Sequence, residues 1–291
     1  MSSDSAFGRT QTSNASASGE DRYSITPSGL GYLDAGPRSD VAVVLLHSLG
    51  ADHRLWAGQV PELSRFWRVI APDSRGHGRS RAVGAPSVDT WTADLAEVLE
   101  HAGVASVSLV GVSLGGIQAI AFAAAYSAVV RALVVADSFV ELDPAVAEAK
   151  VNQLSGQAER EGMDALAASY VEDTLSASAS TQAAGDLRAA IAGMSVNDYS
   201  ASTSACFGVR IADRLAQVSA PTLVLWGALD HKTPRVLAER IASGIAGAQL
   251  VDMPAAGHLS NVDNPERFTE LTVEFLRRRT DVPQGRTKGS I

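Results

Sequence analysis

One serine, Ser113, lies between two glycines in the stretch "LVGVSLGG" (109–116), with apolar runs on both sides. Glycine weakens strands and helices, so Gly111 and Gly115 need a reason other than local stability. The pattern G-x-S-x-G, between a strand-like run and a helix-like run, is typical of a nucleophile elbow. The turn of such an elbow is so sharp that side chains at both glycine positions would collide with neighbouring backbone. We therefore expect Ser113 to be an exposed nucleophile in a strained backbone conformation.

A serine hydroxyl needs a base to become reactive, and that base needs a carboxylate to orient it. His258 lies in the loop "PAAGHLSN", after the last strongly apolar run, and Asp230 lies just past the run "TLVLWG". Both residues would then lie at the same sheet edge as Ser113, so we predict a catalytic triad of Ser113, His258 and Asp230. Asp137, which follows the run "RALVVA", is the alternative acid and is otherwise expected in the pocket.

Acyl transfer also needs backbone N–H donors for the oxyanion that develops in the transition state. Leu114, directly after the nucleophile, is one expected donor, and Leu49 in the stretch "LLHSLGADHRLW" is the other. His47 is expected to brace this stretch through hydrogen bonds rather than to transfer protons. Arg54 and Trp56, a few residues further on, are predicted to bind substrate.

The elements that must position these residues are predicted from hydrophobic patterning. Six runs are apolar on both faces, which is typical of strands in a buried, mostly parallel sheet. Segments 88–103 and 235–247 have helical spacing and end at glycine. This alternation predicts a doubly wound α/β fold. The six runs are 41–48, 67–73, 107–113, 131–138, 220–227 and 248–254.

The alternation is interrupted between residues 140 and 206, where helical spacing replaces strand-like runs. We call this segment the helical insertion. Ligands of such sheets bind outside the carboxyl ends of the strands, so we expect the insertion to form a cap over the site. It contains three cationic residues, Lys150, Arg160 and Arg188, against a clear majority of acidic ones. Residues 21–139 and 207–278 would form the core, with a disordered leader (1–20) and a flexible tail (279–291).

The composition excludes several classes of protein. A formal net charge of −8 without a basic patch disfavours a nucleic-acid partner. The single cysteine, Cys206, permits neither an internal disulfide nor a cysteine-based zinc site. The chain has neither a signal-like leader nor an apolar run long enough for a membrane span, so we expect a cytoplasmic protein that makes no membrane contact.

With these residues identified, the chain resembles the α/β-hydrolase superfamily from about residue 25 to residue 278. The motifs that carry the resemblance are "HSLGADHRLW", "DSRGHGRS", "GVSLGG", "PTLVLWGALD" and "AGHLSNVDNPERF". Within the superfamily, the first and last of these are similar to those of 3-oxoadipate enol-lactonases. The resemblance implies an α/β-hydrolase fold and hydrolysis of a small-molecule carboxylic ester or lactone, with 3-oxoadipate enol-lactone as one candidate. It implies no organic cofactor and no metal.

Other functions are compatible with the same residues. A hydrolase of C–C bonds in a β-diketone or dienoate would use the same triad, as would a cofactor-free haloperoxidase or perhydrolase. A non-catalytic binding module would normally have lost a triad member. The charge of the substrate is open: an acidic lactone needs a cationic wall, for which Arg54 is the expected residue, whereas an alanine-rich cap suits a neutral ester.

Overall fold

The computed structural model describes residues 21–279, so the predicted leader and nearly all of the predicted tail lie outside the described residues. Each of the six predicted apolar runs forms a strand. Two further strands, β1 and β2, were not predicted, because they are short and precede the first strongly apolar run. The strands are β1 (Arg22–Ile25), β2 (Gly31–Ala35), β3 (Val41–Leu46), β4 (Arg68–Pro72), β5 (Ser106–Val112), β6 (Val130–Ala136), β7 (Thr222–Gly227) and β8 (Gln249–Met253).

These strands form one sheet in the order β1-β2-β4-β3-β5-β6-β7-β8. Six neighbouring strands run parallel: β4, β3, β5, β6, β7 and β8. At one edge, β2 pairs antiparallel with β4, and β1 pairs antiparallel with β2. The predicted mostly parallel sheet is therefore confirmed. Because consecutive parallel strands end at the same edge, the loops after β3, β5, β6 and β7 converge there.

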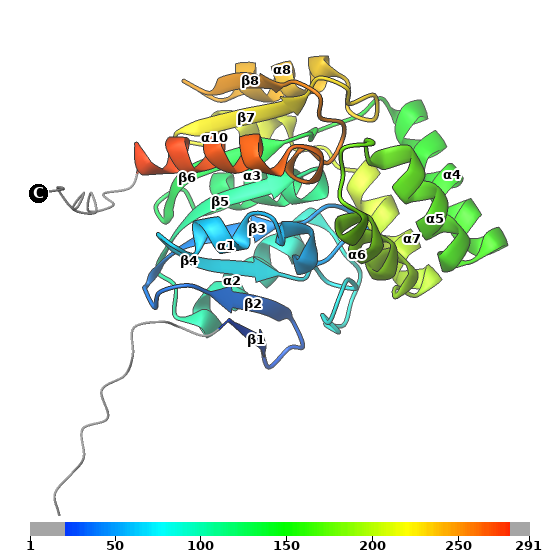
Figure 1. Ribbon diagram of the computed structural model, residues 1–291, viewed down its shortest axis with the longest axis horizontal. Helices are drawn as coiled ribbons and strands as arrows, with labels where there is room; N and C mark the ends of the chain where they lie inside the picture. Colours follow the sequence, from blue (N-terminus) through cyan, green and yellow to red (C-terminus); the bar gives the residue numbers. More distant parts are fainter. Residues whose placement is uncertain (1–20, 280–291) are drawn as a thin grey trace, which may run out of the picture.

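Helices cover both faces of the sheet (Figure 1). Helices α1 and α10 lie on one face, and α2, α3 and α8 lie on the other. The helices outside the insertion are η1 (His53–Trp56), α1 (Val60–Leu63), α2 (Val88–Ala102), α3 (Leu114–Ala125), η2 (Ala212–Gln217), α8 (Arg235–Gly244), α9 (Ser260–Asp263) and α10 (Pro265–Arg277). Helix α3 is almost entirely buried, which explains its run of alanine and isoleucine rather than an amphipathic pattern.

The helical insertion forms four helices between β6 and β7: α4 (Pro144–Glu161), α5 (Met163–Thr174), α6 (Thr181–Ala192) and α7 (Val196–Phe207). They gather at one end of the sheet, the green to yellow region of Figure 1. The two connections to the core run side by side. Glu141 and Arg210 form an antiparallel bridge, and the N–H of Ile211 donates to the carbonyl of Val140 at 3.0 Å. Arg240 of α8 also pairs with Glu141 at 3.1 Å.

Within residues 21–279, no helix combines the length and the hydropathy that crossing a membrane requires.

Candidate active site

The turn between β5 and α3 holds Ser113 in the conformation expected of a nucleophile elbow. Its backbone has φ 54° and ψ −117°, outside the regions that a non-glycine residue normally adopts. A Cβ atom at Gly111 would lie 2.2 Å from the carbonyl oxygen of Gly115, and one at Gly115 would lie 2.0 Å from that of Leu46. The two glycines are therefore required because backbone occupies the space that a side chain would need.

Three side chains from three loops meet at this turn. The Oγ of Ser113 lies 3.0 Å from Nε2 of His258, whose Nδ1 lies 3.0 Å from Oδ2 of Asp230. Asp230 also accepts hydrogen bonds from the N–H groups of Lys232 and Thr233, at 2.8 and 3.0 Å, and from the Thr233 hydroxyl. All three members of the triad are buried. Ser113, His258 and Asp230 thus form a hydrogen-bonded series, which is the arrangement that a nucleophile, its base and an orienting carboxylate require.

The electrostatics of Asp230 favour the charged form. Burial by itself acts to raise the pKa of this carboxyl, but the hydrogen bonds from His258 and Thr233 and the charge of His258 outweigh it. The pKa of Asp230 is therefore held below its usual range. A carboxylate that stays ionised can stabilise an imidazolium at His258 when a proton arrives from Ser113.

Asp137, the alternative acid, forms neither a hydrogen bond nor an ion pair with His258 within residues 21–279. Its Oδ1 accepts from the N–H of Gly227 at 2.7 Å, and its Oδ2 accepts from the N–H of Ser260 at 3.1 Å. Burial, followed by the neighbouring charge of Asp230, raises the pKa of Asp137 well above its usual range. Asp137 does not line the cavity at Ser113, so it connects the two loops that carry Asp230 and His258 instead of facing substrate.

Leu49 and Leu114 carry the backbone N–H groups that are expected to stabilise an oxyanion. Leu114 begins helix α3, and Leu49 lines the cavity with Ser113. Neither N–H donates a hydrogen bond to another atom of residues 21–279. His47 braces the loop of Leu49, as expected: its Nδ1 donates to the carbonyl of Ser48 at 2.8 Å, and its Nε2 accepts from the N–H of Ser74 at 2.9 Å.

A cavity of about 350 Å³ opens onto the serine and the histidine. One wall is aromatic, since the rings of Phe139 and Phe207 stack with their centres 6.0 Å apart. Helices α4 and α5 of the insertion line much of the remainder. A volume of this size suits a small molecule rather than a polymer.

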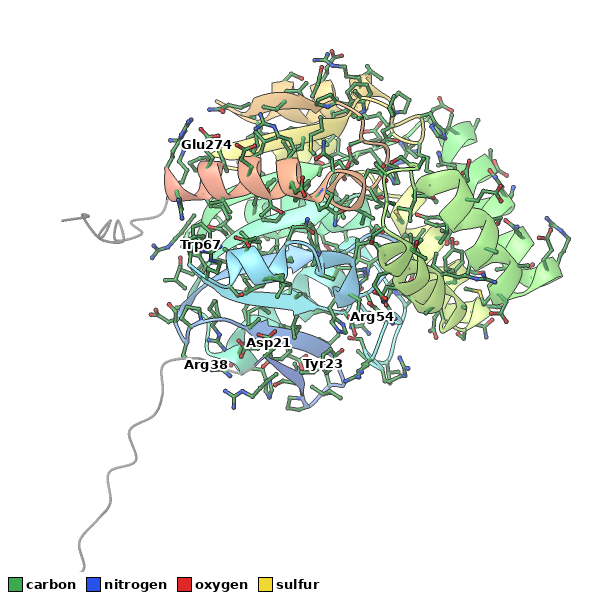
Figure 2. All side chains as sticks on the ribbon, viewed as in Figure 1. Asp21, Tyr23, Arg38, Arg54, Trp67 and Glu274 are labelled. Carbon is green, nitrogen blue, oxygen red and sulfur yellow. The ribbon has the colours of Figure 1, made fainter. Side chains whose placement is uncertain are left out.

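Two predicted substrate-binding residues lie elsewhere. Arg54 pairs with Asp52 at 2.6 Å and with Asp186 of α6 at 3.6 Å, and it lines a separate surface pocket. Figure 2 shows Arg54 where the core meets the insertion. Trp56 is fully buried, with its ring centre 5.9 Å from that of Phe268. Both expectations are corrected: the 3₁₀ turn η1 directs Arg54 to nearby carboxylates and Trp56 into the core.

Two lysines in the cavity were not predicted as site residues. Lys150 comes from α4 and Lys232 from the loop after Asp230. Lys150 is one of the three cations of the insertion, and the helical spacing around it is visible in the sequence. Which face of that helix points into the cavity depends on how α4 packs, and the sequence alone does not reveal this.

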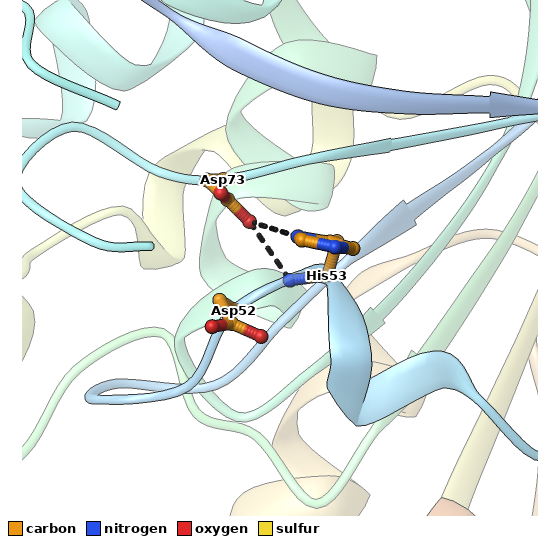
Figure 3. Close-up of side chains that lie close together, drawn as sticks. All are labelled: Asp52, His53 and Asp73. Atoms are coloured by element: carbon orange, nitrogen blue, oxygen red, sulfur yellow. Dashed lines mark hydrogen bonds and ion pairs between the residues drawn. The ribbon is translucent and has the colours of Figure 1, made fainter. Parts of the chain in front are cut away.

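A further cluster of polar side chains lies beside the first loop (Figure 3). Asp52, His53 and Asp73 approach one another closely enough to suggest a metal site. However, Oδ1 of Asp73 accepts from both the backbone N and Nδ1 of His53, at 2.8 and 2.9 Å, and its Oδ2 accepts from Tyr23 and from the N–H of Arg79. Because both oxygens of Asp73 already accept hydrogen bonds, the cluster serves to connect neighbouring segments of the chain.

The fold, together with a serine, a histidine and a carboxylate at the carboxyl ends of parallel strands, defines a class of protein. Residues 41–265 match the family described as alpha/beta hydrolase fold, and the chain belongs to this family. The resemblance inferred from the sequence motifs is thereby confirmed.

Among individual relatives, the chain is similar to enol-lactonases and to an esterase. The chain is 27% identical over 253 residues to 3-oxoadipate enol-lactonase 1 of Acinetobacter baylyi, covering 83% of this chain and 91% of the relative. The enol-lactonase from Burkholderia xenovorans LB400 superposes with a TM-score of 0.80 at 26% identity, covering 88% of this chain and 99% of that one. A thermophilic esterase from Thermogutta terrifontis with bound malate gives a TM-score of 0.79 at 28% identity, covering 90% and 100%.

Proposed function

We propose that this protein is a serine hydrolase that cleaves a carboxylic ester or lactone. The observation that carries the proposal is the hydrogen-bonded chain from Ser113 through His258 to Asp230, which opens into a cavity of small-molecule size. The names of the enol-lactonase and esterase relatives support the same reaction class.

In the first half of the proposed reaction, Oγ of Ser113 attacks the carbonyl carbon while Nε2 of His258 takes the hydroxyl proton. The carbonyl oxygen becomes an oxyanion, which the N–H groups of Leu49 and Leu114 stabilise. The N-terminus of α3 adds a favourable dipole at the same point. His258 then returns its proton to the leaving oxygen as the ester bond breaks, which leaves an acyl group on Ser113.

In the second half, a water molecule loses a proton to His258 and attacks the acyl carbon. Collapse of the second oxyanion breaks the bond to Oγ, and the proton on His258 returns to Ser113. The nucleophile, the base and the oxyanion donors are all supplied by the chain, so this reaction uses neither a metal nor an organic cofactor.

The helical insertion acts, in this proposal, as a cap that selects the substrate, because α4 and α5 line the cavity while the triad comes from the core. The enol-lactonase relatives make 3-oxoadipate enol-lactone a substrate to test. The lone cysteine, Cys206, is buried and unpaired, which suits the reducing cytoplasm.

The test is a panel of substrates offered to the wild-type protein and to Ser113→Ala. The panel comprises 3-oxoadipate enol-lactone, short p-nitrophenyl esters, neutral lactones and a β-diketone. We expect turnover of at least one ester or lactone, and we expect Ser113→Ala to lower kcat by roughly six orders of magnitude while far-ultraviolet circular dichroism stays unchanged.

A Ser113→Ala variant that kept a tenth of the wild-type rate would refute the serine mechanism. If the protein cleaved the β-diketone and none of the esters or lactones, the proposed ester hydrolysis would be wrong and the protein would be a C–C bond hydrolase.

A further inference from the structure

The cavity-facing side of helix α4 carries a lysine. Lys150, Gln153, Leu154 and Gln157 all line the cavity that contains Ser113. Their spacing of three, four and seven residues places them on one face of the helix. The rigid backbone of α4 therefore directs Lys150 toward the cavity, whereas the other two cations of the insertion, Arg160 and Arg188, are exposed and do not line it.

The two lysines of the cavity differ in their partners. Lys232 forms an ion pair with Asp173 and lies 5.1 Å from the centre of the Tyr170 ring. Lys150 has no carboxylate within 4.0 Å in the part of the chain that the structure describes, and it donates no hydrogen bond there. Its Nζ lies 5.6 Å from the centre of the Phe207 ring, which is an attractive contact but not an acceptor for its N–H groups.

Keeping such a cation half-buried is unfavourable. An ammonium has three donors, and burial without a paired charge costs free energy unless another group compensates it. Burial, followed by the charge of Lys232, lowers the pKa of Lys150, and the charges of Asp230 and Asp173 offset this only in part. A methionine at this position would fill a similar volume without this cost.

We propose that Lys150 binds a carboxylate of the substrate, so that the cavity takes small esters or lactones that carry one anionic group. This inference rests on the proposed hydrolase function. A single unpaired lysine matches a single negative charge, whereas a phosphate monoester, with nearly two charges, would call for further cations. The apolar rings of Phe139 and Phe207 line the same cavity and suit the hydrocarbon part of such a substrate.

Lys150, and not Arg54, is the cation that would bind the carboxylate of the substrate. Arg54, the expected residue, is already paired with Asp52 and Asp186 outside this cavity. Asp173 is the acidic residue of the insertion that lines the cavity, and Lys232 neutralises it. Lys150 is then the cation left to attract an anion into the site.

A matched pair of substrates tests the proposal. One is the mono-p-nitrophenyl ester of glutaric acid, and the other is the same ester with its free carboxyl converted to a primary amide. We expect the wild-type protein to prefer the acid by about tenfold or more in kcat/KM, mostly through KM. Lys150→Met should bring the ratio of the two rates toward one, and Lys150→Arg should restore part of it.

Arg188→Met is the matched control, because it removes one positive charge from the same insertion at an exposed position outside the cavity. This variant should keep the wild-type preference. Equal rates for acid and amide with the wild-type protein, or an equal loss of preference in both methionine variants, would overturn the proposal.

Binding gives a readout that does not depend on turnover. We expect glutarate to bind Ser113→Ala in isothermal titration calorimetry, and we expect adding Lys150→Met to weaken its Kd by about tenfold. If no ester is hydrolysed but glutarate binding depends on Lys150, the proposed function fails and the carboxylate site stands. If binding is the same with and without Lys150, the carboxylate site fails even where esters are hydrolysed.

Discussion

Ser113 and Asp137 hold their backbones at φ 54° and 49°, at the carboxyl ends of the neighbouring strands β5 and β6. Non-glycine residues rarely adopt such angles, and they persist only where surrounding contacts fix them. At Ser113 the strain exposes a hydroxyl to the cavity. At Asp137 it turns a carboxylate toward the N–H groups of Gly227 and Ser260. One strained residue thus presents its hydroxyl to the cavity, and the other connects the loops that carry Asp230 and His258.

Asp137→Asn tests this positioning role. Both oxygens of an aspartate or of its protonated form can accept from N–H groups, but the amide nitrogen of asparagine cannot. One buried N–H then loses its acceptor, so we expect the free energy of unfolding to fall by about 1–3 kcal/mol. The kcat should fall with little change in KM, because the loops that place Asp230 and His258 relax while the cavity wall does not.

Urea unfolding and steady-state kinetics measure the two effects. Asp40→Asn is the control, since Asp40 is exposed and its side chain has no hydrogen bond within residues 21–279. Wild-type stability and kcat in Asp137→Asn would contradict the role we assign to Asp137.

At the scale of elements, the elbow depends on how closely β5 and α3 approach each other. A methyl group at Gly111 would lie 2.2 Å from a backbone oxygen of α3, so neither element can accommodate it without moving. We expect Gly111→Ala to lower the free energy of unfolding by at least about 3 kcal/mol or to prevent soluble expression, and Gly111→Val to be worse.

Gly185 in the middle of α6 provides the opposite case. A Cβ there meets nothing within 4 Å. Gly185→Ala should therefore raise stability by about 0.5–1 kcal/mol, because alanine favours the helix. Chemical denaturation measures the free energy of unfolding, which should fall in Gly111→Ala and rise in Gly185→Ala. A Gly111→Ala variant as stable as wild type would contradict the close approach of β5 and α3.

The sequence predicts those strands and helices whose residues form an unbroken apolar run or a regular helical pattern. Six strands are visible as apolar runs because helices cover both of their faces, and α2 and α8 are visible from helical spacing that ends at a glycine. The proximity of Ser113, Asp230 and His258 could be predicted because strand ends and glycine turns restrict where these residues can lie. The strands β1 and β2 lack an apolar run, and the orientation of α4 depends on contacts with α5 and α7. For that reason the sequence points to Arg54, close behind Leu49, as the cation of the site and does not reveal that Lys150 lines the cavity.

At the scale of the whole molecule, Asp73 joins parts that are distant in sequence. Its carboxylate accepts from Tyr23 of β1, from His53 of η1 and from the N–H of Arg79. Burial acts to raise the pKa of this carboxyl, but the hydrogen bond and charge of His53, the charge of His47 and the N–H of Arg79 outweigh it. The pKa of Asp73 in the folded protein therefore lies below that in the unfolded chain.

This depressed pKa predicts how stability changes in acid. Stabilisation by Asp73 is fully present above the unfolded pKa of about 3.9 and is lost as the pH falls through the folded pKa. Near neutral pH, Asp73→Asn should unfold with about 2 kcal/mol less free energy than wild type.

That difference should shrink as the pH falls below about 4, because the wild-type protein then loses its charge as well. Urea titrations at several pH values provide the measurement, and a difference that stays constant into acid would contradict the assignment.

The paired connections of the helical insertion have a consequence for how such a protein can change over generations. Val140 and Glu141 leave the core beside Arg210 and Ile211, and hydrogen bonds hold the two stems together. The segment between the stems can change in length and sequence while both stems stay attached to the core, and Ser113, Asp230 and His258 all lie outside that segment. Mutations in the insertion therefore alter the part of the cavity wall that α4 and α5 supply and leave these three residues unchanged, whereas Phe139 and Lys232 of the same wall belong to the core.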